Sequence, residues 1–81
     1  MNIQLIQGNF KAKDALEIIT QMIHVKIKFH ENQINTRINE EDIKNREAKI
    51  KRLQNDLFNI RNFIEKGEGK INIQGEIHLS N

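Results

Sequence analysis

The sequence contains no cysteine, proline, tryptophan or tyrosine, and only four phenylalanines and four glycines among its 81 residues. Without cysteine, the chain can form neither a disulfide nor a thiolate metal site. A chain of this length buries only about 60% of its unfolded surface, so the core of a single copy is marginal. Chains with so few apolar residues usually need a disulfide, a bound metal or a partner chain to be stable. Because a disulfide is excluded, we expect the chain to self-associate as a homodimer.

The sequence also lacks an excess of one charge and any long hydrophobic run. Its 13 basic residues stand against 11 acidic ones, which gives a net charge of +2 and no concentrated basic field for nucleic acid. The opening stretch MNIQLIQGNF has neither the basic region nor the apolar core of a secretory signal. No apolar run approaches the ~20 residues of a membrane span. We therefore expect a cytoplasmic protein that does not enter a membrane.

A long stretch without glycine gives the clearest helical pattern, over residues 40–66. Asn39 is a favourable N-cap, and the three acidic residues after it complement the positive end of the helix dipole. Ile38 and Ile43 have the spacing of a hydrophobic staple around this start. Apolar residues then recur at the spacing of a coiled-coil seam, and Arg46 occupies the one position where an apolar residue is missing. Either glycine of the sequence KGEGK can take the left-handed conformation that ends many helices.

The preceding stretch, MIHVKIKFH at residues 22–30, alternates apolar and basic residues as a half-buried strand would. A strand there would need a connection after the helical pattern of residues 15–22, and no turn is present. Two apolar ridges at helical spacing also pass through this stretch, so we interpret residues 11–34 as one helix, with the strand as the alternative. The first ridge contains Ala15, Ile18, Met22, Val25 and Phe29, and the second contains Leu16, Ile19, Ile23, Ile27 and Ile34.

These two ridges cover an arc of roughly 200° of the helix, which is wider than one neighbouring helix can cover. The outer ridge therefore has apolar surface left over after the two helices pack against each other. We predict that Met22, Val25, Phe29 and Ile18 form a dimer or partner interface.

The two ends of the chain read as strands, because apolar and polar residues alternate in NIQGEIHL and, less regularly, in NIQLIQG. In the first strand, Ile3 and Leu5 are expected on one face and Ile6 on the other. The predicted fold is an α+β arrangement, β-α-α-β, with a long antiparallel coiled-coil-like hairpin and a short antiparallel strand pair completed by dimerisation. The predicted order is strand 2–8, helix 11–34, loop 35–39, helix 40–66 and strand 70–79, within a single domain over residues 1–81.

Polar residues at the predicted helix seam form the one candidate site for a ligand: Lys26, His30, Arg46 and Glu47. Lys26 is expected to reach solvent or to pair with Glu47 on the facing helix. His30 is expected near Arg46 as a satisfied boundary residue, and a bound ligand is the alternative. A metal site is not expected, because His24 and His30 are six residues apart and point to different sides of a helix.

No catalytic residue or cofactor is expected, since the sequence has no cysteine nucleophile, no glycine-rich phosphate loop and a single serine, Ser80, near its end. The seam residues are similar in type to those inside small all-helical chorismate mutases. The sequence lacks the N-terminal arginine pattern of those enzymes, and its strands do not belong to their fold. We therefore expect a small, non-catalytic protein-interaction or assembly module, a homodimer with an unidentified protein partner as a further possibility.

The opening MNIQLIQGNFKAKDALEII resembles the first strand and helix of ribosome hibernation-promoting factors, and GEIHLS is similar to a strand of that family. Members of that family continue with three strands, whereas residues 39–66 here are helical in pattern. The resemblance implies ribosome or RNA association, which is the alternative function. The basic residues that would carry it are Lys26, Lys28, Arg37, Lys49 and Arg52.

Overall fold

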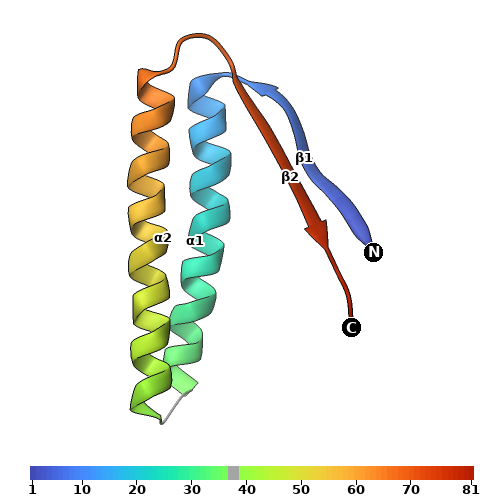
Figure 1. Ribbon diagram of the computed structural model, residues 1–81. Coiled ribbons are helices and arrows are strands. Elements are labelled where there is room, and N and C mark those ends of the chain that lie inside the picture. The colour runs from blue at the N-terminus through green and yellow to red at the C-terminus, as the bar shows by residue number, and fades with distance from the viewer. Residues whose placement is uncertain (37–38) are drawn as a thin grey trace.

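The computed structural model describes residues 1–36 and 39–81, with side chains for all of these except residues 35 and 36. The elements follow the predicted order, β1 (Asn2–Phe10), α1 (Ala12–Thr36), α2 (Glu40–Lys66) and β2 (Ile71–His78) (Figure 1). The α+β fold class with a helical hairpin and an antiparallel strand pair is confirmed. Arg37 and Ile38, which entered the predicted loop, basic set and staple, lie outside the described residues.

The stretch MIHVKIKFH is helical, because α1 continues without interruption through residues 22–30. Its apolar residues alternate with basic ones because two apolar ridges of one helix contribute residues to the same stretch: Met22, Val25 and Phe29 from one, Ile23 and Ile27 from the other. α1 begins at Ala12 and extends into part of the predicted loop, to Thr36. The two helices run side by side for most of their length (Figure 1).

The two ends of α2 are capped in different ways. At the start, the Asn39 side-chain oxygen accepts a hydrogen bond from the Glu41 backbone N–H at 2.8 Å, as predicted for an N-cap. At the end, the Gly67 N–H donates to the carbonyls of Phe63 and Ile64, while Gly67 itself is extended at φ −74°. The left-handed conformation belongs to Gly69, with φ +78°, in the link to β2 rather than at the helix end.

The two strands form an antiparallel ribbon from the pair Phe10–Ile71 to the pair Asn2–His78, and both strands contact α1. A bulge at Leu5 separates the pairs Gln4–Glu76 and Ile6–Gly75. Because paired residues share a face, this extra residue puts Ile3 and Ile6 on the same face, and the expectation that they lie on opposite faces was wrong. The Gln4 side-chain amide donates to the Ile6 carbonyl at the bulge.

The chain is one layer thick. Its Cα atoms span 47 × 32 × 13 Å with a radius of gyration of 15.3 Å, whereas a compact domain of this length has about 12 Å. The ribbon meets α1 at one end and diverges from it along the rest of its length (Figure 1). Of the described residues, only Ala15, Ile64 and His30 are buried, with 0%, 3% and 5% of their surface exposed. The small apolar core therefore lies where α1 begins, α2 ends and the ribbon meets α1. We call this end of the molecule, opposite the connection between the helices, the closed end.

This core leaves no room for a larger side chain at Ala15. We expect Ala15→Leu to lower the free energy of unfolding by about 1–3 kcal/mol through overpacking. Urea unfolding followed by circular dichroism at one protein concentration measures this change. Ala48→Leu is the matched control, since Ala48 is exposed on α2 and its substitution should change the value by less than about 0.5 kcal/mol. Equal effects of the two substitutions would contradict the placement of the core.

Candidate functional site

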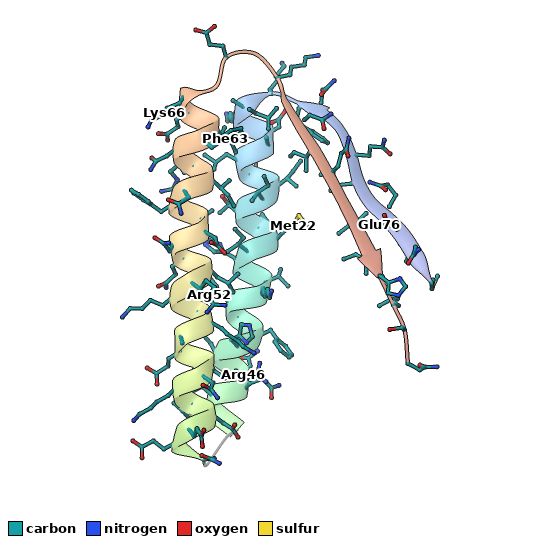
Figure 2. The ribbon with its side chains drawn as sticks, in the orientation of Figure 1. Met22, Arg46, Arg52, Phe63, Lys66 and Glu76 are labelled. Carbon is teal, nitrogen blue, oxygen red and sulfur yellow. The ribbon has the colours of Figure 1, made fainter. Side chains whose placement is uncertain are left out.

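The outer ridge of α1 remains uncovered after α2 has packed against the other side of the helix. Met22, Val25 and Phe29, which we call the α1 ridge, expose 43%, 70% and 53% of their surface, whereas Ile18 is half-buried. Met22 points from α1 toward the side on which the ribbon lies (Figure 2). Ile18 is nearer the end of α1 at which the ribbon meets the helix (Figure 1). The α1 ridge is exposed because the ribbon has diverged from the helix by that point.

The inner face of the ribbon shows the same gradient. Ile71 and Ile73 near the closed end are half-buried, whereas Ile3, Ile77 and Leu79 toward the open end are exposed. The alternation of β2 and the bulge in β1 place Ile3 and Ile77 on the same face as the half-buried Ile71 and Ile73, the face that turns toward α1, and Leu79 follows just after β2. The α1 ridge and the three exposed ribbon residues together form what we call the open apolar face. The open apolar face therefore has two sides, one on α1 and one on the ribbon, and these two sides pack against each other only at the closed end.

Two exposed aromatic side chains on α2 were not among the predicted interface residues. Phe58 and Phe63 lie outside the apolar spacing of the α2 seam, next to the seam residues Leu57 and Ile64. Phe63 extends from α2 near its end (Figure 2). The sequence could have indicated these two residues as interface candidates, because they lie outside the seam spacing and the packing of the hairpin does not need an aromatic residue there.

A polar contact occupies the helix seam where an apolar residue is missing. The Arg46 guanidinium donates to His30 Nδ1 at 2.8 Å and lies 5.7 Å from the centre of the Phe29 ring. Phe29 and His30 in turn meet edge to face at 5.6 Å. Arginine has no acceptor, so Nδ1 must accept, and the neutral imidazole then carries its proton on Nε2. Arg46 thus fixes the tautomer of a buried histidine and also contacts the α1 ridge.

The other nitrogen of this ring, His30 Nε2, is buried without a hydrogen-bond partner in the described part of the chain. His30 was expected to be satisfied near Arg46, and the structure satisfies only one of its two nitrogens. Burial lowers the pKa of His30, and the positive charges of Arg46, Lys49 and Lys26 lower it further. Protonation would also remove the acceptor that Arg46 uses, so the buried ring is held neutral.

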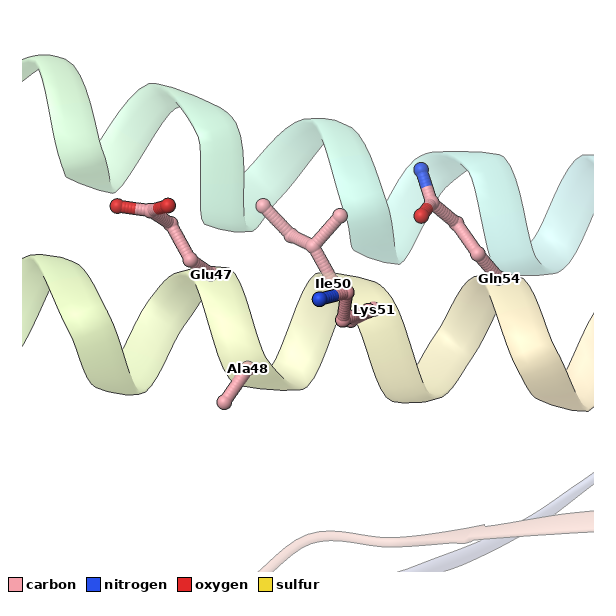
Figure 3. A pocket seen from close by; sticks show the side chains of 5 residues that line it. All are labelled: Glu47, Ala48, Ile50, Lys51 and Gln54. Carbon is pink, nitrogen blue, oxygen red and sulfur yellow. The ribbon is translucent and has the colours of Figure 1, made fainter.

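The four predicted seam residues lie in two places rather than one. Lys26 and His30 line a cavity of about 240 Å³, which we call the seam cavity, and its other lining residues are Lys49, Arg52, Leu53 and Asp56. Glu47 lines a separate, more open cavity of about 390 Å³, where Glu47, Ile50 and Gln54 point from α2 toward α1 (Figure 3). Within the described residues, Lys26 forms no ion pair with Glu47. Of the two outcomes expected for Lys26, the structure has the exposed one, and its charge acts on His30 together with those of Arg46 and Lys49.

The residues proposed for RNA contact are divided in the same way. Lys26, Lys49 and Arg52 share the seam cavity, while Lys28 is exposed and does not line it. In the described ranges, no three histidine, aspartate or glutamate side chains lie together as a metal site would need. Neither helix, as far as it is described, has an apolar stretch long enough to cross a membrane.

No family model, curated protein or solved structure matches the chain. The direct succession of α1 and α2 also departs from the three strands that follow the first helix in ribosome hibernation-promoting factors. The open apolar face and the helix seam are therefore the features of this chain that bear on its function.

The neutral, buried state of His30 predicts a pH dependence of stability. Because the pKa of His30 is lower in the folded chain than the ordinary value of 6.5, the unfolded chain binds more protons between the two values. This contribution to stability is full above about pH 6.5 and is lost as the pH falls below it. We expect the free energy of unfolding, measured with urea, to decrease from about pH 7.5 to about pH 5.

The His30→Gln variant should lose this component and show a flatter pH dependence than the wild type. His24→Gln is the matched control, because His24 is exposed on the same helix, and this variant should keep the wild-type slope. Identical slopes for the wild type and His30→Gln would contradict a buried, neutral His30.

Proposed function

We propose that the chain is a non-catalytic assembly module that forms a symmetric homodimer, with the open apolar face buried between the two copies. The observation that carries this proposal is the surface area of the single chain. The chain exposes 6688 Å², whereas a compact monomer of its 9.6 kDa mass exposes about 5,100 Å². The difference of about 1,600 Å² has the size of a buried interface rather than of a rough surface.

This area agrees with what a permanent dimer requires. Burial of about 1,600 Å² on each of two chains would remove about 3,200 Å² in total, within the roughly 2,000–5,000 Å² typical of obligate homodimers. A stable domain also needs two packed layers, and one copy supplies a single layer 13 Å thick. A second copy placed on the open apolar face supplies the missing layer.

The chemistry of the face favours a second copy over an unrelated partner. A two-fold interface uses the same patch twice, so each chain must supply both of the surfaces that meet. The open apolar face does so, because it combines a helical ridge with the inner face of a ribbon from one chain. The net charge of +2 opposes the approach of two copies only weakly. Two-stranded ribbons are also marginal alone, and pairing between copies would extend the sheet.

Sedimentation equilibrium at micromolar concentration tests the dimer and its interface. The wild type should have twice the mass of the 9.6 kDa chain. Phe29→Glu places a charge within the α1 ridge, and burying that charge between two apolar faces costs free energy even with Arg46 nearby, so this variant should be a monomer. Phe58→Glu makes the same change at an exposed phenylalanine on α2 and should remain a dimer.

A folded wild-type monomer would contradict the proposal. A dimer that persists in Phe29→Glu but dissociates in Phe58→Glu would place the interface on α2 instead. RNA or ribosome association is the second candidate, supported by the three cations of the seam cavity, and it predicts an affinity that falls steeply with salt.

A further inference from the structure

We propose that the seam cavity binds a phosphoryl group, either inorganic phosphate or the phosphate of a small phosphate monoester. The cavity of about 240 Å³ lies between α1 and α2 and is lined by Lys26, His30, Lys49, Arg52, Leu53 and Asp56. This site goes beyond the assembly function and does not depend on it, because all of its residues belong to one chain.

The first observation that points to a ligand is the unsatisfied donor of His30. The residue is 95% buried, its Nδ1 accepts from Arg46, and its Nε2 has no partner among the described residues. The tautomer that Arg46 imposes makes Nε2 an N–H donor. Buried donors without an acceptor are rare and costly in native proteins. Nε2 itself is closed off from solvent, so an acceptor from outside the chain would complete the hydrogen bonding of this ring once the exposed side chains around the cavity move aside.

The second observation is the charge around the same cavity. Lys26, Lys49 and Arg52 supply three positive charges, and Asp56 supplies the one negative charge among the lining residues. No ion pair within the described residues joins Asp56 to these cations, so their donors remain available. These charges favour an anionic acceptor for His30 over a neutral one, and they would repel a metal ion.

The net charge of the residues that line the cavity favours a phosphoryl group over other anions. Three cations and one carboxylate leave an excess of two positive charges, with His30 neutral. A phosphate monoester carries about −1.5 to −2 at neutral pH and offers three acceptor oxygens, whereas a carboxylate carries a single charge. The planar fork of Arg52 suits two phosphate oxygens, and the two lysines can act as point charges beside them. Leu53 supplies the apolar wall of the cavity.

The experiment follows the His30 ring directly. The imidazole ¹⁵N resonances of the full chain are recorded through their couplings to the carbon-bound ring protons while inorganic phosphate is added at constant ionic strength, with chloride as the replaced anion. We expect a saturable shift of the His30 resonance, and no such shift of His24, which is exposed on the same helix. Methyl phosphate is the second probe: tighter binding than inorganic phosphate identifies a phosphate monoester as the ligand, and weaker binding identifies the free ion.

Charge-matched variants on α2 separate the site from general attraction. The double variant Lys49→Gln/Arg52→Gln removes two cations from the cavity and should weaken phosphate binding by about tenfold or more, since it removes charge-assisted hydrogen bonds. The double variant Lys44→Gln/Lys51→Gln removes two cations of the same helix that do not line the cavity, and it should weaken binding by less than about twofold. All four side chains are exposed, so both variants should fold like the wild type.

Four outcomes would overturn the proposal. The first is the absence of any saturable shift, and the second is equal weakening in the two double variants, which would mean diffuse electrostatics. The third is a His30 resonance that moves with protein concentration and not with phosphate, because the acceptor would then come from a second copy. The fourth is binding of a single-stranded RNA without terminal phosphate when neither small phosphate binds, which would favour the alternative function.

Discussion

α1 carries apolar residues around more of its circumference than this short chain can cover. α2 packs on one ridge, and the other ridge is buried at Ala15 and half-buried at Ile18, toward the end where the ribbon meets α1 (Figure 1). Beyond that point the ribbon diverges, and the chain remains a single layer 13 Å thick. The hydrophobic effect favours removal of that surface from water, and the remaining way to remove it is contact with another molecule. The fold and the proposed assembly are therefore two consequences of the same excess.

The polar seam has a cost of its own that the hairpin must offset. Arg46 takes the place of an apolar seam residue, and His30 is buried opposite it with one nitrogen unsatisfied. A polar residue at a seam position typically lowers stability but fixes the register of the helices. We expect the Arg46–His30 hydrogen bond to have this role here, because sliding α2 by one turn would leave both nitrogens of a buried ring unpaired. The Arg46 guanidinium also contacts Phe29, so the residue that pairs with His30 touches the α1 ridge as well.

Much of the fold could be predicted from the sequence because its pattern is long and periodic. The two ridges correctly predicted a helix through residues 22–30, and Asn39 correctly predicted where α2 begins. The bulge at Leu5 could not be predicted, because an extra residue is defined only by the register of the partner strand. For Lys26 the sequence left two outcomes open, solvent or a pair with Glu47, because apolar spacing does not determine which polar residues of the facing helix a seam residue meets. In the structure Lys26 is exposed and lines the seam cavity with Lys49 and Arg52.

If a second copy completes the folded state, thermal unfolding depends on protein concentration. When folding and dimerisation are coupled, the midpoint of unfolding rises with protein concentration by mass action. We therefore expect the Tm of the wild type to rise across an approximately hundredfold range of concentration. A Tm that stays constant over that range, together with a monomeric mass, would mean that one layer is stable alone and that no second copy is needed.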